Sequence, residues 1–257
     1  MAKLELKNIT VKFGGLSALS DLSFSINSGE VLGLIGPNGA GKTTVFNVLT
    51  GVYQATEGDV LFQGESILGH RPYEIFSKGV ARTFQNIRLF ANMTAVENTM
   101  VARHCRSSRG IVSALFKTRA QQKEELFIRK KGQEALDFMG VGEFADTVAS
   151  NLPYGLQRRL EIARAIASEP KVLLLDEPAA GMNPSESSEL MKDIARISEL
   201  GIDVLLVEHD MKVVMGVCNR IVCVDHGVKI AEGTSQDIQN NPKVIEAYLG
   251  QPATPTD

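Results

Sequence analysis

Cysteine is scarce in this 257-residue chain, and none of the three that occur fits a metal-binding pattern. Cys105, Cys218 and Cys223 form no CxxC pair, which excludes the usual metal-ligand spacings and redox-pair motifs. We therefore expect three reduced thiols, as in proteins of the reducing cytosol.

Long apolar runs are also missing. The first ten residues alternate polar and apolar side chains and contain no signal-peptide core. No run approaches the ~18 apolar residues that a membrane-spanning helix needs. We expect a protein that does not cross a membrane by itself.

The chain lacks a strong excess of either charge. It has 27 basic and 30 acidic residues, for a net charge of -3, which argues against a general nucleic-acid binder. Residues 101–131 are an exception, with nine Lys or Arg and two Glu. This stretch is either a solvated helix face or a surface near anionic lipid headgroups or a membrane partner.

Several short runs have the patterns of strands. Residues 3–8 and 21–27 alternate, residues 30–35, 171–175 and 203–207 are mostly apolar, and residues 220–224 and 228–232 flank a turn. Apolar runs indicate strands buried on both faces of a sheet, and the last two indicate a hairpin. Buried strands that alternate with helices predict an α/β fold with its site at the strand carboxyl ends.

Residues 96–140 lack strand patterning and contain long polar helical stretches. We predict a helical lobe at 87–168, inserted into an α/β core formed by 1–86 and 169–233. A C-terminal helix and tail follow at 234–257, and the last seven residues, QPATPTD, are expected to fray.

The strongest motif follows the apolar run at 30–35. It fits GxxxxGK[ST] without a mismatch and consists of Gly36, Pro37, Asn38, Gly39, Ala40, Gly41, Lys42 and Thr43. Its glycines let backbone N–H groups converge on phosphate oxygens, and a helix predicted to begin near Gly41 adds partial positive charge. We expect Lys42 to reach the β- and γ-phosphates of ATP and Thr43 to bind Mg²⁺, with Thr44 in the same nucleotide site.

A second motif ends the apolar run at 171–175 with two acids. The strand delivers Asp176 to its carboxyl end, where it can hold Mg²⁺ through water. Glu177 comes next and can orient or deprotonate the attacking water. Two acids after a strand are also an ordinary strand-to-loop step, but a phosphate loop in the same chain favours a catalytic pair.

The phosphate loop, Gln85, a signature-like segment, Asp176-Glu177 and His209 occur in an order that closely resembles the nucleotide-binding subunits of ABC transporters. The resemblance covers essentially the whole chain. It implies a P-loop NTPase (RecA-like) core with an antiparallel β part and an inserted α-helical lobe. It also implies two subunits that bind two ATP molecules head to tail, each between one phosphate loop and the other subunit's signature segment.

The resemblance also implies individual roles. Phe13 corresponds to the aromatic residue that stacks on adenine. Gln85 resembles the residue that senses Mg²⁺ and the γ-phosphate and couples to the membrane partner. His209 resembles the histidine that contacts the γ-phosphate.

Two segments depart from the family pattern. The usual signature is Leu-Ser-Gly-Gly-Gln, and the run at 152–156 reads Leu-Pro-Tyr-Gly-Leu, so the serine hydroxyl is absent. Gly155 and the N-terminus of the following helix remain as donors to the partner's nucleotide. Asn183 stands where the family usually has an aspartate.

One subfamily shares more of the wording, namely the ATPase subunits of branched-chain amino acid importers. The similar stretches are 82–85, 154–155, 157–164, 178–181, 208–211, 241–242 and 247–250. This resemblance implies an ATPase on the cytoplasmic face of the membrane that drives import of branched-chain or other hydrophobic amino acids. Its expected partners are a second ATPase subunit (identical or different), membrane permease subunits and an extracytoplasmic solute-binding protein.

Other functions stay open at this point. Related ABC ATPases serve urea import or lipopolysaccharide export, and soluble ones act without a transporter. The chain has one cassette and no long heptad segment, which argues against the soluble class. It has no NKxD motif of a GTPase, and Glu177 argues against a regulatory module that binds ATP without hydrolysis.

Overall fold

The computed structural model describes residues 2–103, 105 and 119–249. The expected fraying of the tail, and the central part of the basic stretch at 101–131, lie outside the described residues. Within them, no helix combines the length and the apolar character that crossing a bilayer requires.

A six-stranded sheet forms the centre of the molecule. The sheet runs in the order β10 (Val228–Gly233), β9 (Arg220–Asp225), β3 (Val31–Ile35), β8 (Asp203–Val207), β7 (Val172–Asp176) and β6 (Val80–Arg82). All neighbours are parallel except the β9–β10 hairpin. The three predicted apolar strands and the hairpin are therefore confirmed.

Both faces of this sheet are covered, which explains why its strands read as unbroken apolar runs. Leu173 and Leu175 of β7 point into one buried cluster, and Leu174 points into the other. The second cluster includes Phe46 of α1 (Lys42–Leu49), so α1 packs on that face. α1 begins one residue after Gly41, as predicted.

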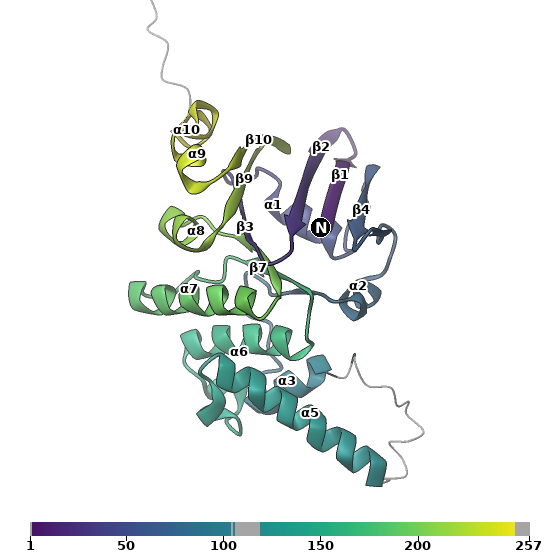
Figure 1. Cartoon of the computed structure of the whole chain (residues 1–257), viewed down its shortest axis with the longest axis vertical. Coiled ribbons are helices and arrows are strands. Elements are labelled where there is room, and N and C mark those ends of the chain that lie inside the picture. Colours follow the sequence, from purple (N-terminus) through teal and green to yellow (C-terminus); the bar gives the residue numbers. More distant parts are fainter. Residues whose placement is uncertain (1, 104, 106–118, 250–257) are drawn as a thin grey trace, which may run out of the picture.

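An antiparallel sheet packs over the α1 side (Figure 1). Its order is β2 (Leu16–Asn27), β1 (Ala2–Phe13), β4 (Glu57–Phe62) and β5 (Glu65–Ser66). β1 and β2 are longer than the predicted 3–8 and 21–27 because register shifts interrupt the alternation. Asn8 and Asp21 both have positive φ at these irregularities, and the Asn8 amide donates to the Asp21 carboxylate at 2.6 Å.

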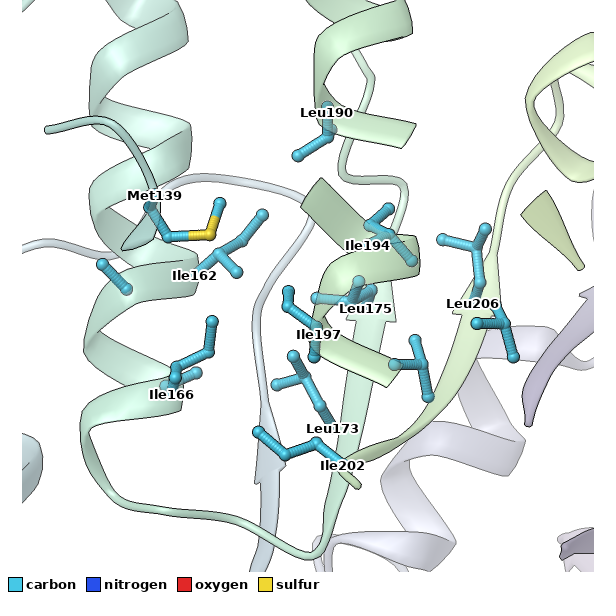
Figure 2. Close-up of a cluster of buried hydrophobic side chains, with 14 of the residues drawn as sticks. Met139, Ile162, Ile166, Leu173, Leu175, Leu190, Ile194, Ile197, Ile202 and Leu206 are labelled. Carbon is cyan, nitrogen blue, oxygen red and sulfur yellow. The ribbon is translucent and has the colours of Figure 1, made fainter. Parts of the chain in front are cut away.

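Helices form the lower part of the molecule in Figure 1. These are α3 (Ala95–Arg103), α5 (Arg119–Phe138) and α6 (Tyr154–Ala167), with short 3₁₀ turns at Gly142–Phe144 and Ala149–Asn151. Figure 2 shows how Ile162 and Ile166 of α6 face Ile197 of α7 (Pro184–Glu199) and Leu173 of β7. The helical lobe and the central sheet thus share one apolar cluster. The boundaries of the lobe at 87–168 remain a prediction.

The remaining helices are short. α2 (Pro72–Lys78) precedes β6, and α8 (Met211–Val217) follows β8. The single C-terminal helix expected within 234–257 is two helices, α9 (Ser235–Gln239) and α10 (Pro242–Leu249). Pro242 explains the interruption, because proline lacks the N–H that would continue α9 and suits the first turn of a new helix.

Strand register sets the position of the site. Val207 of β8 pairs with Leu34 of β3 on one side and with Asp176 of β7 on the other. The three strands therefore end at one level, and the residues that follow them meet at one edge of the sheet.

Candidate functional site

The loop after β3 is shaped by close approaches that only glycine permits. A Cβ atom on Gly36 would lie 2.1 Å from the carbonyl oxygen of Val224, and one on Gly41 would lie 2.8 Å from Leu19. Both glycines have positive φ, of 154° and 106°. The loop is thus a compact turn pressed against β9 and β2, with its backbone free of side-chain obstruction.

Lys42 folds back over this loop. Its Nζ donates to the carbonyl oxygens of Gly36, at 2.6 Å, and Pro37, at 2.9 Å. Burial lowers the pKa of the Lys42 ammonium, and the nearby carboxylate of Glu177 partly opposes that shift. A cation therefore lies within the turn, held by main-chain oxygens that an anionic ligand can replace.

The start of α1 offers donors to such a ligand. Gly41 is the N-cap in a left-handed conformation and makes no side-chain cap hydrogen bond. The N–H of Val45 already donates to Gly41, whereas the first three amides of a helix have no acceptor within it. The amides of Lys42, Thr43 and Thr44 therefore face the mouth of the loop, where helix N-termini attract anions.

Asp176 lies at the end of β7, buried beside an arginine that the motifs did not assign. Its Oδ2 is 2.9 Å from the guanidinium of Arg82, which also donates to the Asn47 side chain at 2.8 Å. The guanidinium lies over the rings of Phe46 and Phe84. Arg82 thus fixes the orientation of Asp176, and it joins α1 to the end of β6.

Glu177 has an uncommon backbone conformation. Its φ is +46°, and its N–H donates to the carbonyl of Val207 at 2.9 Å. A left-handed backbone conformation at a non-glycine residue costs on the order of 1–3 kcal/mol, and such residues often occur at functional sites. The side-chain Oε2 accepts a 2.9 Å hydrogen bond from the Gln85 amide and lies 3.6 Å from His209 Nδ1.

Glu208 supports this arrangement from below. Its side chain is fully buried, and Oε1 accepts from the N–H of Ala179 at 2.8 Å. Burial raises the pKa of the Glu208 carboxyl, and that hydrogen bond opposes the rise. Glu208 therefore fixes the loop after Glu177. Nothing in the sequence indicates this role, because Glu208 stood out only as part of the family-like stretch at 208–211.

The site residues predicted from the sequence lie in three places. Lys42, Asp176, Glu177, Gln85 and His209 come together at the strand ends. Phe13 lies outside that cluster, half-exposed at the tip of β1, where it makes an edge-to-face contact with Tyr53 at 5.1 Å between centroids. The same hairpin brings Ala18 against the phosphate loop, so an aromatic face is available beside it.

Gly155 lies in the first turn of α6, away from these contacts. Its neighbour is Glu186 of α7, where a Cβ on Gly155 would come within 2.9 Å of a carboxylate oxygen. Tyr154 donates to the carbonyl of Ala180 at 3.0 Å. Asn183 caps α7 by accepting a hydrogen bond from the Glu186 N–H. Through the Tyr154–Ala180 hydrogen bond, the segment after Glu177 is tied to the start of α6.

The donor set for a metal contains only oxygen. Thr43, Gln85 and Asp176 offer a hydroxyl, an amide oxygen and one carboxylate. Among the described residues, no group of three or more His, Cys, Asp or Glu could hold a metal ion. Hard oxygen donors with one carboxylate fit Mg²⁺, which usually keeps water and takes phosphate oxygens as further ligands.

Comparisons with known proteins point to one family. Residues 19–180 match the ABC transporter family, and residues 228–254 match the family described as branched-chain amino acid ATP-binding cassette transporter. The chain is 47% identical over 249 residues to the high-affinity branched-chain amino acid transport ATP-binding protein BraF of Pseudomonas aeruginosa. That alignment covers 96% of this chain and 98% of BraF. LivG of Escherichia coli is 45% identical over the same shares of the two chains.

Solved structures resemble the whole fold. The crystal structure of the ADP conformation of MJ1267, an ATP-binding cassette of an ABC transporter, aligns with a TM-score of 0.85 and 33% identity. It covers 98% of this chain and 100% of the other. A dimeric post-hydrolysis structure of the cassette MJ0796 with ADP and Pi has a TM-score of 0.75 and 25% identity, covering 90% and 98%.

Proposed function

Because the chain belongs to the family of ABC transporter ATP-binding subunits, we propose that it hydrolyses ATP to drive import of branched-chain amino acids through separate permease subunits. The observation that carries the substrate class is the near-full-length identity to BraF and LivG, together with the match at 228–254. Urea, lipopolysaccharide and non-transport roles have no comparable support.

The phosphate loop binds the triphosphate. The amides at the start of α1 and the Lys42 ammonium supply positive charge where the β- and γ-phosphates lie. In the described state the Lys42 ammonium donates to the carbonyl oxygens of Gly36 and Pro37, which belong to the loop itself. When ATP binds, phosphate oxygens replace these two carbonyls as the partners of Lys42. Phe13 provides the stacking face for adenine.

Thr43, Asp176 and Gln85 are the residues that would hold Mg²⁺ beside these phosphates. The ion, when bound, neutralises charge on the β- and γ-phosphates. Arg82 holds the Asp176 carboxylate in one orientation through their 2.9 Å contact. Gln85 reaches the same place from the end of β6, so one side chain can serve both the metal and Glu177.

Glu177 acts as the general base. Its carboxylate takes a proton from the attacking water, the oxygen of that water bonds to the γ-phosphorus, and the bond to the β-phosphate oxygen breaks to release ADP. His209, whose Nδ1 lies 3.6 Å from Oε2 of Glu177, contacts the γ-phosphate beside the base. In the described state the Gln85 amide donates to Oε2 of Glu177, so a movement of Gln85 changes the position and the hydrogen bonding of the base.

The catalytic assembly contains two cassettes. The signature segment at Gly155 contacts the ATP bound by the other subunit, as in the head-to-tail arrangement of the family. Pro153 has neither a hydroxyl nor an N–H, so the donors there are the backbone near Gly155 and the helix N-terminus. The dimeric MJ0796 structure supports such an assembly, and the second subunit is either identical or related.

A groove between the lobe and the core suits the permease. It has a volume of about 380 Å³ and is lined by Phe76, Phe84, Phe90 and Val101, with Arg82, Glu161 and Arg164 at its polar side. Its apolar walls suit a short amphipathic helix of a membrane subunit, and Phe84 precedes Gln85 directly. The proposal includes a peripheral position on the cytoplasmic face of the membrane and a solute-binding protein on the other side.

The test is reconstitution. The tagged chain is purified with the membrane subunits that accompany it, and uptake of radiolabelled leucine and of urea into proteoliposomes is measured with and without ATP. We expect ATP-dependent leucine uptake that a Glu177→Gln variant lacks. ATP-dependent uptake of urea alone would overturn the substrate, and uptake unaffected by Glu177→Gln would overturn the motor role.

A further inference from the structure

Three charged residues of α6 hold the segment that carries Gln85. Arg158 donates to the carbonyl oxygens of Phe84, at 2.7 Å, and of Gln85, at 2.6 Å. Glu161 accepts from the N–H of Arg88 at 3.2 Å, and Arg164 donates to the carbonyl of Arg88. We call Arg158, Glu161 and Arg164 the α6 clamp. It fixes both ends of the Gln85 segment to one helix of the lobe.

Two members of the clamp are deeply buried and charged. The Arg158 and Glu161 side chains are both 0% exposed, and their NH1 and Oε2 atoms lie 2.9 Å apart. A buried ion pair is often no more stable than apolar residues of the same size. In the described part of the chain, Nε of Arg158 has no hydrogen-bond partner, which adds to the cost. Stability alone therefore does not account for this pair.

Arg158 also lies near the signature segment. It is three residues, or about one helical turn, after Gly155. Its NH2 is 3.4 Å from the hydroxyl of Tyr154, and that hydroxyl donates to Ala180 in the loop after Glu177. One guanidinium thus contacts the start of α6 and the backbone of Gln85.

The path continues to the proposed catalytic base. The main chain of Gln85 is held by Arg158, and its side-chain amide donates to Glu177 at 2.9 Å. A small shift of the first turn of α6 would move the Gln85 carbonyl, and with it the amide that occupies Glu177.

We propose that Arg158 is a positioning residue that transmits contact at the signature segment to Gln85 and so controls Glu177. The inference rests on the proposed function, in which Gly155 contacts the partner's ATP while Gln85 and Glu177 act on the subunit's own ATP. Arg158 is then the physical link between the two nucleotide sites. Its role is to make hydrolysis at one site depend on ATP at the other.

Arginine is required for this link because its planar fork reaches two successive carbonyls at once. Lysine keeps the positive charge beside Glu161 but presents a single ammonium, which cannot reproduce that grip. Arg158→Lys therefore removes the contact with the two carbonyls while it keeps the positive charge. Arg159→Lys is the matched control, since Arg159 is the next residue of α6 and contacts Met139, Glu189 and Asp193 instead.

The experiment measures ATP hydrolysis by the full-length chain as a function of ATP concentration. For Arg158→Lys we expect kcat to fall about tenfold and the Hill coefficient to drop toward about 1, with unchanged ATP affinity of the monomer. Arg159→Lys should behave like the unmodified chain. An unchanged Hill coefficient and kcat in Arg158→Lys would overturn the inference.

A second background separates transmission from general destabilisation. If Arg158 acts through Gln85, then Arg158→Lys lowers kcat by less than about a further twofold in a chain that already carries Gln85→Ala. An equal loss in both backgrounds would overturn the inference. Should Arg158→Lys fail to fold, the pair Arg158→Met and Glu161→Leu removes both buried charges together and should show the same loss of cooperativity.

Failure of the proposed function gives a different result. A Glu177→Gln chain should form an ATP-dependent dimer by light scattering. A chain that binds ATP without dimerising would overturn the two-site arrangement and the inference with it. A dimer that forms normally while Arg158→Lys retains full cooperativity would overturn the inference alone.

Discussion

The strand-end cluster and the first turn of α6 differ in how they are built. Lys42 follows β3, and Asp176 and Glu177 lie at the end of β7, two parallel strands that end at one level on either side of β8. Each of the three already has protein partners in the single chain. Gly155 lies in the first turn of α6, beside Glu186 of α7. The first region is proposed to bind and cleave ATP with residues of one subunit, whereas the second is proposed to act on a nucleotide that another subunit holds.

The difference predicts two kinds of defect. Changes in the strand-end cluster should alter the binding or cleavage of ATP by a single chain. Changes at the start of α6 should leave binding by a single chain intact and impair what depends on two chains. The following variants are chosen to break or sharpen this division.

The largest effect is expected for Glu177→Gln. Glutamine keeps the shape and the contact with Gln85 but cannot accept the proton of water, so kcat should fall by roughly 10²–10⁴-fold. ATP affinity should stay within about twofold of the unmodified chain. Steady-state hydrolysis and equilibrium binding of a fluorescent ATP analogue measure the two quantities. Turnover near the unmodified level would remove Glu177 from the role of base.

Much of the strand-end cluster could be predicted from the sequence, since each part has a local signal. The phosphate loop is contiguous, and Asp176-Glu177 ends an apolar run. The lengths of β1 and β2 could not be predicted from the sequence, because Asn8 and Asp21 interrupt the alternation of polar and apolar residues that marks a strand.

The α6 clamp was also beyond sequence reasoning. Arg158, Glu161 and Arg164 follow a helical spacing that equally describes a solvated, charged surface. Only the fold shows that the segment 84–88 covers them. Glu208 is similar, because a polar residue after a strand gives no sign that it anchors the loop after Glu177. Interactions between segments far apart in the chain leave no periodic pattern.

Lys42→Ala should produce the next largest effect, and it acts on binding. It removes a charge-assisted contact worth about 1.5–3 kcal/mol, so ATP affinity should fall by roughly ten- to 150-fold. Lys78→Ala, at the end of α2, is a suitable control because Lys78 pairs with the exposed carboxylate of Glu65 at 3.6 Å. Equilibrium titration of the isolated chain is the measurement. Unchanged affinity would contradict the phosphate-loop assignment.

Gly155→Asp tests the other region. A Cβ there already meets Glu186 at 2.9 Å, and a carboxylate would add repulsion toward both Glu186 and the partner's phosphates. In a Glu177→Gln background we expect ATP-driven dimerisation to weaken at least about tenfold, since like charges oppose close approach. ATP binding by the monomer should survive. Light scattering and titration on the same samples separate the two, and hydrolysis indifferent to Gly155→Asp would contradict the role of this segment.

Tyr248→Phe should have the smallest effect, and it asks whether α10 belongs to the strand-end region. Gly36 donates its N–H to the Tyr248 hydroxyl at 2.9 Å, which links the segment matched at 228–254 to the first residue of the phosphate loop. Burial raises the pKa of Tyr248 to about 12, so the hydroxyl stays protonated throughout the neutral range.

Loss of that hydroxyl removes one hydrogen bond, worth about 0.5–1.5 kcal/mol, from the N–H of Gly36. We therefore expect ATP affinity to weaken about two- to tenfold with kcat nearly unchanged, because the phosphate loop loses support while Glu177 and Gln85 keep their contacts. Tyr73→Phe on exposed α2 is the control. If Tyr248→Phe lowers kcat and leaves affinity intact, α10 acts on the chemical step, and the division between a binding region built within one chain and a region completed by the partner would have to be redrawn.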